Sequence, residues 1–347
     1  RELNLGRDSS GGNHWEGILD EVRVWNRTIS WKEINASYNN GIYRLENNFT
    51  NLTEDFYNYT AWSMDRAGNL DKSGNRNLTV DITNPKISWS NPTPDNDNIT
   101  KNNWAYLNTT VTDNSTTSAF FDFNHSLVGY WSFDYVSSGG TVYDNSTYGY
   151  HGSMINLDES NVVYGKYGRA VEFNGNNSYI NCGDNESLQP INGTVEALIK
   201  PNYVGSGGQV IYTGSTGGSY WRSPYFYLNN GEINLHLTNN TAVSTYSSSG
   251  ISQTGKWYHV AATWNGTDVV FYINGNLTDS ETQTITPISN KYTKRIGALN
   301  PPSWPTAFNG TIDEVRLYNR ALSYEEINAS YNNRLNELDH NFTELLD

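Results

Sequence analysis

Short runs of β-branched and aromatic residues alternate with turns rich in Gly, Asn and Ser along most of the chain. This spacing is typical of the strands of an all-β sandwich or jelly roll. Three turns contain an Asn-Gly pair (230–231, 265–266 and 274–275), which suits a tight hairpin. Ser323, with Glu326 three positions later, predicts one short helix through a capping box. The predicted strands are LVGYWSF, RAVEF, GTVEALIKP, QVIYTG, YFYLNNGEINLHL, KWYHVAATW, DVVFYINGNLT, KRIGAL and GTIDEVRLY.

A long repeat frames this pattern. Residues 20–40 read DEVRVWNRTISWKEINASYNN, residues 313–333 read DEVRLYNRALSYEEINASYNN, and 15 of the 21 positions are identical. The similarity continues at the same offset of 293 residues, so that HNFTELLD (340–347) parallels NNFTNLTE (47–54). Self-similarity at a fixed period indicates an array of repeated units. We therefore expect the chain to start inside one unit and stop inside the next, as a piece of a longer polyprotein.

The amino-acid composition excludes several classes of protein. The chain has 347 residues, of which 14% are aromatic and 17% are charged, whereas disordered chains are poor in aromatics and rich in charge. Its net charge of −14 argues against a nucleic-acid binder, which needs a basic surface. Cys182 is the only cysteine, so an internal disulfide framework and a cysteine-based zinc site are excluded. No apolar run in this window approaches the length of a transmembrane segment.

Asparagine is unusually abundant, with 49 residues, and many lie in Asn-x-Ser/Thr triplets. Twenty such triplets occur where about nine would arise by chance, and turn chemistry explains about half of the count. The excess indicates covalent N-glycans on exposed loops of an extracellular, cell-surface protein, and such density resembles archaeal surface-layer and filament proteins. The candidate glycosylation sites are Asn26, Asn35, Asn48, Asn51, Asn58, Asn77, Asn98, Asn108, Asn114, Asn124, Asn145, Asn176, Asn185, Asn192, Asn239, Asn265, Asn276, Asn309, Asn328 and Asn341.

The region from about Leu127 to Asn333 resembles laminin-G-like, concanavalin-type jelly-roll domains. The resemblance implies one complete jelly roll over 125–333, and residues 1–40 as the C-terminal part of a preceding copy. Leu198 departs from the family, which usually has Trp there, and this position is expected to lie in the core. The matching segments, in family order, are LVGYWSFD, VYDNSTYGYHGSM, YGKYGRAVEFNGNNSYINC, GTVEALIKP, KWYHVAATWNG, VVFYINGNL and FNGTIDEVRLYNRALSYEEI.

Residues 41–124 resemble immunoglobulin-like or fibronectin-like sandwiches. The segment 41–84 reads as two late strands joined by a hairpin, and 85–124 reads as early strands, with a third strand over 118–124. The last residues, 334–347, match the start of 41–84 and would begin the next immunoglobulin-like segment. We therefore expect each jelly roll to be inserted within an immunoglobulin-like domain, since insertion at a loop costs little where chain ends lie close together. A single closed sandwich over 41–124 would contradict this expectation.

The sequence gives little evidence for a catalytic site. Glucanases of the concanavalin type place two Glu around an Asp on one strand, and the nearest string here is EINLH (232–236). It supplies one carboxylate, whereas glycoside hydrolysis needs two. No nucleophile elbow, HExxH motif or phosphate-binding loop is present, and His259 is expected to be a packed, hydrogen-bonded residue. We interpret the chain as non-enzymatic.

A structural calcium ion is the predicted cofactor, because similar jelly rolls hold one and Ca²⁺ prefers oxygen ligands from acidic or Asn-rich loops. The resemblance implies Asp313 as a ligand, with Asp20 as its counterpart in the repeat. Asp134, Asp144 and Asn174 are the candidate companions. The alternative is that Asp313 caps a strand and pairs with Arg316 or another arginine.

Carbohydrate binding is a second candidate activity. Trp221, Tyr225 and Tyr227 lie in one aromatic-rich segment, and sugars stack on exposed aromatic faces. Tyr225 and Tyr227 share one face of a period-2 strand, with Phe226 on the other. The alternative is that the tyrosines pack in the core or shield an interface.

The sequence as a whole favours a heavily glycosylated structural protein, a subunit or repeat of an extracellular filament, stalk or surface layer. Its expected partners are copies of itself or adjacent repeats, joined by exchange of unpaired strands. The alternative is an adhesin or lectin whose jelly roll binds external carbohydrate. A weaker alternative is an accessory module of a large secreted glycosidase.

Overall fold

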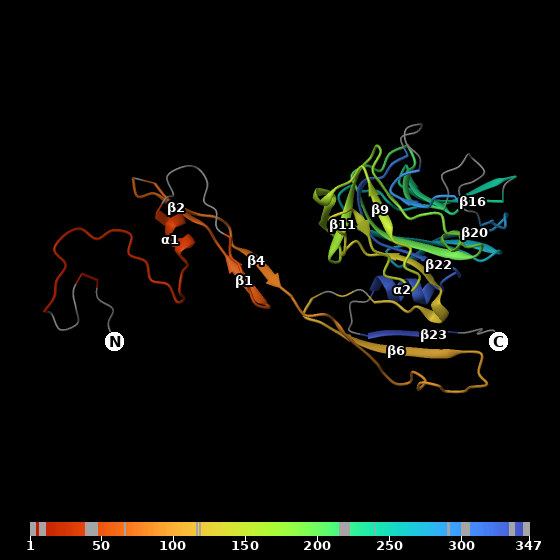
Figure 1. Ribbon diagram of the computed structural model, residues 1–347, viewed down its shortest axis with the longest axis horizontal. Coiled ribbons are helices and arrows are strands. Elements are labelled where there is room, and N and C mark those ends of the chain that lie inside the picture. The colour runs from red at the N-terminus through yellow and green to blue at the C-terminus, as the bar shows by residue number, and fades with distance from the viewer. Residues whose placement is uncertain are drawn as a thin grey trace. The chain divides into compact units, whose positions relative to one another are not determined.

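The structure is a computed structural model with two compact units, residues 1–82 and 83–347 (Figure 1). The residues that the structure describes are 5–6, 12–38, 48–65, 67–115, 117, 119–214, 223–239, 241–289, 292–299, 306–332 and 337–342.

The larger unit contains a sandwich of two eight-stranded antiparallel sheets, which confirms the predicted all-β jelly-roll class. In spatial order the first sheet has β10 (Val162–Tyr164), β11 (Arg169–Asn174), β22 (Asn309–Tyr318), β13 (Gly193–Pro201), β18 (Tyr258–Trp264), β19 (Asp268–Ile273) and β20 (Asn276–Thr282), with β7 (Leu127–Trp131) also paired to β22. The second has β17 (Val243–Ser249), β16 (Glu232–Thr238), β15 (Tyr225–Asn229), β14 (Gln209–Thr213), β21 (Arg295–Ile296), β12 (Tyr179–Asn181), β9 (Gly152–Ile155) and β8 (Thr141–Val142).

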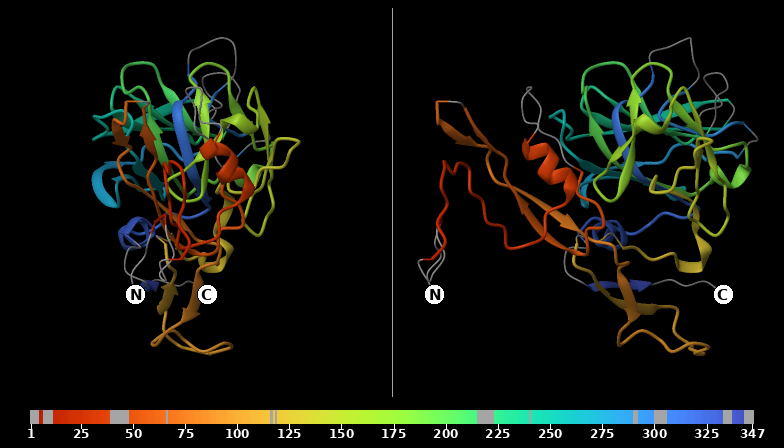
Figure 2. Two further views of the ribbon diagram at one scale, coloured as in Figure 1. Left: turned by 90° about the vertical axis from the view of Figure 1, so that its left-hand side faces the viewer. Right: turned by 60° about the vertical axis from the view of Figure 1, so that its left-hand side comes forward.

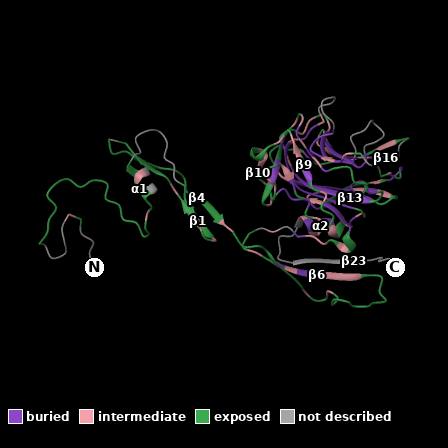
Figure 3. Ribbon diagram, in the orientation of Figure 1, coloured by how far each residue is buried: buried purple, intermediate pink, exposed green. Residues whose placement is uncertain are grey.

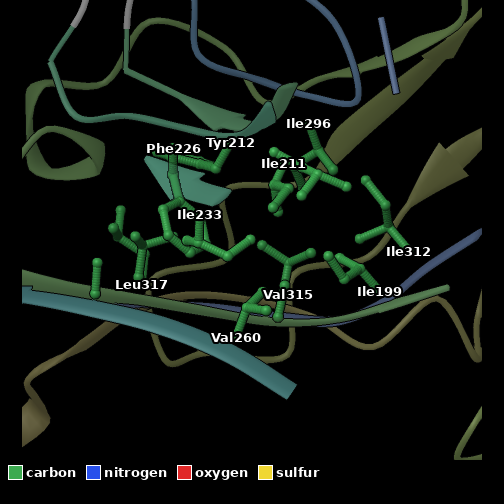
Figure 4. Close-up of a cluster of buried hydrophobic side chains, with 14 of the residues drawn as sticks. Ile199, Ile211, Tyr212, Phe226, Ile233, Val260, Ile296, Ile312, Val315 and Leu317 are labelled. Carbon is green, nitrogen blue, oxygen red and sulfur yellow. The ribbon is translucent and has the colours of Figure 1, made fainter. Parts of the chain in front are cut away.

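One apolar core fills the space between these sheets (Figures 3 and 4). Period-2 alternation sends every second side chain of a strand into it. Phe226 of β15 and Ile233 of β16 enter from the second sheet, and Val260 of β18 and Leu317 of β22 enter from the first. All four are fully or almost fully buried, and burial of each such side chain contributes about 1.5–3 kcal/mol.

The predicted hairpin turns are confirmed at two of the three Asn-Gly pairs. Asn230-Gly231 joins β15 to β16, and Asn274-Gly275 joins β19 to β20. All four residues have positive φ, as the tight type I′ turn requires, and Asn and Gly tolerate that conformation best. At the third pair Gly266 has positive φ and Asn265 does not.

The predicted helix is confirmed as α2 (Tyr324–Asn332). The Ser323 hydroxyl accepts a hydrogen bond from the Glu326 N–H at 3.3 Å, and the Glu326 carboxylate accepts one from the Ser323 N–H at 2.9 Å. This reciprocal pair is the predicted capping box. Three 3₁₀ helices occur among the described residues, η1 (Phe123–His125), η2 (Glu159–Asn161) and η3 (Glu186–Leu188).

A small third sheet lies on the other side of α2 from the sandwich (Figures 1 and 2). Its order is β23 (Glu337–Phe342), β6 (Ala105–Thr112) and β5 (Lys86–Trp89), all antiparallel. Val111 of β6 is buried against Phe121 and against Ala329 of α2. The sheet therefore combines two strands that precede the jelly roll with one that follows it.

The prediction of a third strand over 118–124 is wrong for the residues described there. Phe123–His125 forms η1 instead, and Asn124 and His125 both have positive φ, which is incompatible with a strand. The Asp122 carboxylate accepts a hydrogen bond from the Leu127 N–H at 2.9 Å and holds this bend. The aromatic residues that suggested a strand are packing anchors.

The smaller unit contains α1 (Trp31–Tyr38) and two paired segments, β1 (Asp55–Tyr59) with β4 (Arg76–Val80), and β2 (Trp62–Met64) with β3 (Leu70–Lys72). The strands form a long interrupted hairpin, as predicted for 41–84. The start of α1 repeats the capping box of α2, because Ser30 and Glu33 exchange the same two hydrogen bonds.

Candidate functional site

The outer face of the second sheet carries an aromatic cluster. Tyr225 and Tyr227 of β15 both point away from the core, while Phe226 between them points into it. The two tyrosine rings stack with centroids 4.4 Å apart, and His236 of β16 meets both rings edge-on. We call Tyr225, Tyr227 and His236, with Val210 and Leu299 packed beside them, the tyrosine face.

A polar contact orders the tyrosine face. The Tyr227 hydroxyl lies 2.8 Å from His236 Nε2. Burial, together with the nearby charge of Glu232, raises the pKa of Tyr227 to about 12, so its hydroxyl stays protonated at neutral pH. Glu232 and His236 are the ends of the EINLH string, which proves to be a strand with Ile233 and Leu235 in the core.

An arginine borders this face on the neighbouring strands. The Arg295 guanidinium of β21 stacks over the ring of Tyr179 of β12, 4.2 Å from its centroid. It also donates a hydrogen bond to the carbonyl of Leu299. Tyr225 and Tyr227 are buried, at 3% and 8% exposure, so they are packed rather than freely exposed. Trp221, the third predicted sugar-stacking residue, lies outside the described residues.

The second candidate site is the loop between β10 and β11, which receives two acidic side chains. Asp313 Oδ2 accepts hydrogen bonds from the N–H groups of Lys166 (2.8 Å) and Tyr167 (3.1 Å). Asp134 Oδ1 accepts one from the Arg169 N–H at 2.8 Å. Glycine is required in this loop, because a Cβ on Gly165 would lie 2.5 Å from Asp313 Oδ2.

Asp313 is in an unusual state for a carboxylate. It is fully buried, and its Oδ1 has no hydrogen-bond partner among the described residues. Burial, followed by the neighbouring charge of Glu314, raises the pKa of Asp313 to about 8. Asp313 Oδ1, which has no hydrogen-bond partner among the described residues, is an oxygen of the kind that a cation takes as a ligand. Among the described residues, Arg316 forms its ion pairs with Glu196 and Glu314 rather than with Asp313.

The other predicted calcium ligands are engaged elsewhere. Both Asp144 oxygens accept hydrogen bonds from the loop after β8, including the Tyr150 N–H at 2.7 Å. Asn174 Oδ1 accepts from the Asn176 N–H in its own turn, and Asp20 lies exposed in the smaller unit. Within the described part of the chain, no three His, Cys, Asp or Glu side chains gather as they would around a metal ion.

A buried layer of charge lies between the first sheet and α2, and sequence reasoning missed most of it. The Glu196 carboxylate of β13 contacts Arg316 of β22 at 3.1 Å and His259 of β18 at 3.0 Å. Arg316 also pairs with Glu314, and its guanidinium lies 4.1 Å from the ring centroid of Phe120. His259 confirms the prediction of a packed, hydrogen-bonded residue.

The signal for this layer was present in the sequence. Glu196 interrupts a run that is otherwise typical of a buried strand, and a charge that is buried needs a partner. Arg316 lies in a strand that also carries Asp313 and Glu314. A cavity of about 20 Å³, lined partly by Leu198, His259 and Tyr331, opens beside the layer. Leu198 itself is 7% exposed and therefore buried, as expected.

The predicted glycan acceptors differ in accessibility. Asn58 of β1 and Asn77 of β4 are exposed and directly opposite each other across the two strands. Asn108 of β6 is buried at 7% exposure, and its side-chain amide donates a hydrogen bond to the Asn91 carbonyl at 2.9 Å.

None of the described helices is long and apolar enough to cross a membrane.

Comparison with known proteins agrees with the jelly roll. Residues 174–328 match the family model Laminin_G_3, described as the concanavalin A-like lectin/glucanases superfamily. No curated protein matches the chain in sequence.

Solved structures of similar fold include domain 4 of an extracellular arabinanase from Geobacillus stearothermophilus in complex with arabinotriose. It is 23% identical with a TM-score of 0.47, and the match covers 59% of this chain and 98% of that domain. The binding domain of Paraclostridial Mosquitocidal Protein 1 is 19% identical with a TM-score of 0.47, over 60% of this chain and 52% of its own. The binding domain of botulinum neurotoxin serotype D is 20% identical with a TM-score of 0.45, over 61% and 52%.

Proposed function

We propose that this chain is a non-enzymatic structural module of an extracellular surface, a heavily N-glycosylated subunit or repeat of a filament, stalk or surface layer. The observation that carries the proposal is the pairing of β23 with β6. These strands lie on either side of the jelly roll in the sequence, and they pair over Glu337–Phe342 and Ala105–Thr110. The join of both flanking segments in one sheet supports a jelly roll inserted in a host domain, an arrangement suited to a repeating scaffold.

The ends of the jelly roll are placed for such an insertion. The Asn319 N–H, just after β22, donates to the Ser126 carbonyl, just before β7, at 2.9 Å. The Arg320 side chain also donates to the Ser126 hydroxyl at 3.1 Å. An insert whose two ends are adjacent replaces a loop of its host without distorting it.

An immunoglobulin-like host is supported by Tyr57 of β1. Its hydroxyl donates a hydrogen bond to the Thr53 carbonyl, four residues upstream, at 2.9 Å. A tyrosine near the start of a late strand that bonds back to upstream backbone is a hallmark of immunoglobulin-like sandwiches. This contact supports the assignment of β1 as a late strand of such a sandwich.

The glycan acceptors support an extracellular position. Asn58 and Asn77 point to one face of the β1–β4 sheet, so two glycans would cover that face together. The test is mass spectrometry of glycopeptides from native cell envelopes, using the chain's own sequence to identify them. We expect the chain in the envelope fraction with glycans at Asn58 and Asn77. Recovery of an unglycosylated chain from the cell interior would contradict the proposal.

Carbohydrate binding is a second candidate function, favoured by the tyrosine face. The tyrosine face, with the arginine that borders it, gathers two tyrosines, a histidine and an arginine, which are residue types that sugar recognition uses, although the two rings are largely covered at 3% and 8% exposure. Glycan-array binding that falls at least tenfold in Tyr227→Phe, and is unchanged in the exposed control Tyr164→Phe, would support it. Absence of binding to any glycan by the wild-type chain would remove this candidate.

A structural calcium ion remains the proposed cofactor, with Asp313 and Asp134 as the residues that would hold it. A bound cation would neutralise two carboxylates that meet at one loop and would favour ionised Asp313. Isothermal titration with Ca²⁺ after chelation should show binding that Asp313→Asn abolishes and the exposed control Asp158→Asn retains. Absence of both heat and a thermal shift in the wild type would exclude the ion.

A further inference from the structure

The sequence contains seven Asn-Gly pairs, and this dipeptide is where asparagine most readily loses its side-chain amide. The backbone nitrogen after the asparagine attacks the side-chain carbon Cγ and expels ammonia, and glycine leaves that nitrogen unobstructed because it has no Cβ. A fold suppresses the reaction where hydrogen bonds hold the side chain or the peptide group that must rotate. The pair at 40–41 lies outside the described residues, and the others begin at Asn174, Asn192, Asn230, Asn265, Asn274 and Asn309.

Three of these pairs are followed by threonine, so that each is also a glycan acceptor. They begin at Asn192, Asn265 and Asn309. A glycan attached to the amide nitrogen replaces the small leaving group that the reaction needs. The exclusion of these three pairs rests on the proposed glycosylation, whereas the remaining pairs are compared by their contacts alone.

The pair at 174–175 is held by hydrogen bonds on both reacting groups. Asn174 Oδ1 accepts a hydrogen bond from the Asn176 N–H at 2.9 Å. The Gly175 N–H, which would be the nucleophile, donates to the Phe308 carbonyl at 2.9 Å. Ring closure at this pair requires both contacts to break.

The pair at 274–275, in the turn between β19 and β20, is held as well. Asn274 Oδ1 accepts a hydrogen bond from the His259 N–H at 3.0 Å. The Asn274 carbonyl accepts one from the side-chain amide of Asn276 at 3.2 Å, which fixes the peptide group that would rotate. Gly275 is covered by α2, because a Cβ there would lie 2.7 Å from the ring of Tyr331.

The pair at 230–231 forms the same turn between β15 and β16, and both of its residues have positive φ as at 274–275. Asn230 is exposed, and its side-chain amide forms no hydrogen bond with any residue that the structure describes. Within the same described residues, neither the Asn230 carbonyl nor the Gly231 N–H forms one. The turn is anchored only on either side of this peptide group, by the Asn230 N–H to Gly205 and by the Gly231 carbonyl to Ile251.

We propose that Asn230 is a site of spontaneous deamidation, a covalent modification that converts it to aspartate or isoaspartate. The Gly231 nitrogen gives its proton to solvent and forms a bond to Asn230 Cγ. The bond from Cγ to the side-chain nitrogen breaks, so that ammonia leaves and a cyclic succinimide remains. A water molecule then opens the ring at either of its two carbonyls. No oxidant, reductant or enzyme takes part, because water is the only co-reactant.

The modification acts on the hairpin that carries the tyrosine face. Asn229 and Glu232 pair on either side of the turn. Isoaspartate adds a methylene to the backbone between them, and either product places a second negative charge beside Glu232, which opposes their approach. The products therefore loosen the end of β15 and β16 as the protein ages.

Ageing of the purified full chain in mildly alkaline buffer, followed by peptide mass spectrometry, tests the proposal. The peptide with Asn230 should convert at least about tenfold faster than the peptide with Asn274, because reaction at Asn274 must first break hydrogen bonds that Asn230 lacks. In concentrated urea the two peptides should convert at similar rates, since the fold no longer distinguishes them. Equal rates in the folded chain, or an Asn230 that converts in urea and stays intact in the folded chain, would overturn the proposal.

A variant tests whether hydrogen bonds cause the difference. Asn276→Ala removes an exposed side chain that holds the Asn274 carbonyl, so it should speed conversion at Asn274 severalfold and leave conversion at Asn230 unchanged. An unchanged rate at Asn274 would overturn the basis on which Asn230 is assigned. Asn230→Asp is the control that should show no isoaspartate at this turn.

Hydrogen exchange tests the expected effect on the hairpin. In the fraction that carries isoaspartate at 230, the amides of β15 and β16 should exchange faster than in the fresh chain, because local opening has become easier. Unchanged exchange in that fraction would overturn the predicted loosening.

Failure of this inference is distinguishable from failure of the proposed function. Conversion of Asn192 in chains isolated from native envelopes would show that this acceptor carries no glycan, which counts against the glycosylated surface role and leaves Asn230 unaffected. An intact Asn230 in an aged, glycosylated chain would overturn the deamidation alone.

Discussion

At the scale of single residues, the buried charge of Glu196 shows how this fold holds an ion in its interior. Burial opposes ionisation of the carboxyl, but the hydrogen bond with His259 and the charge of Arg316 outweigh it and hold the pKa of Glu196 at about 2. A buried ion pair contributes little net stability but is costly to break, because the remaining charge is left uncompensated. Glu196 therefore fixes the register between β13, β18 and β22.

This environment predicts a specific acid sensitivity. Because the folded-state pKa lies below the ordinary value, ionised Glu196 stabilises the fold at neutral pH, and this stabilisation is lost as pH falls from about 4 towards 2. Glu196→Gln should lower the free energy of unfolding at pH 7 by roughly 3 kcal/mol and flatten its decline over that pH window. Urea denaturation at several pH values measures both. The exposed control Glu172→Gln should change neither, and an unaltered acid profile in Glu196→Gln would contradict the account.

The asparagines make a second residue-scale prediction. Asn108 satisfies the acceptor triplet but its amide is buried and hydrogen-bonded to Asn91, so a glycan could be attached only by breaking that contact. We expect glycopeptide mapping of the native protein to show Asn58 and Asn77 occupied and Asn108 bare. Quantitative occupancy of Asn108 would show that β6 is not packed as described.

At the scale of elements, the capping box at the start of α2 is testable separately from the core. Replacing the capping serine removes the hydrogen bond to the Glu326 N–H, and such a loss typically costs about 1 kcal/mol. Ser323→Ala should lower the free energy of unfolding by that amount, whereas the exposed control Ser138→Ala should have no effect. Chemical denaturation measures the difference, and equal stability of the two variants would show that α2 does not depend on its cap.

Local signals in the sequence predicted most of the elements, and long-range contacts explain the rest. The Asn-Gly pair at 274–275 and the capping serine at 323 act on their own neighbours, so their effect can be read directly. The Glu196–Arg316 pair joins strands 120 positions apart, and nothing local identifies the partner. The false strand over 118–124 had strand-like composition, but Phe120 and Phe121 pack against Arg316 and Trp89 respectively.

In the candidate sites, too, local features were predicted from the sequence and long-range contacts were not. Alternation along β15 correctly separated Tyr225 and Tyr227 from Phe226, because a period of two is a local property of the strand. The sequence did not predict that His236 contacts these tyrosines, because the contact depends on the pairing of β15 with β16. Of the predicted calcium ligands, Asp313 and Asp134 reach one loop, and only the topology of the sheets determines that they do.

At the scale of the whole molecule, segments on both sides of the jelly roll share one sheet. The strand β23 after the jelly roll pairs with β6 before it, which is the arrangement expected of a domain inserted in a host.

The central claim is that the chain is a structural module of an ordered extracellular assembly, and electron microscopy of native envelopes labelled with antibody against the jelly roll tests it most directly. The account predicts regularly spaced label along a filament, stalk or surface lattice, with continuous density between successive jelly rolls. Label scattered without order over the surface, or confined to the cell interior, would contradict it.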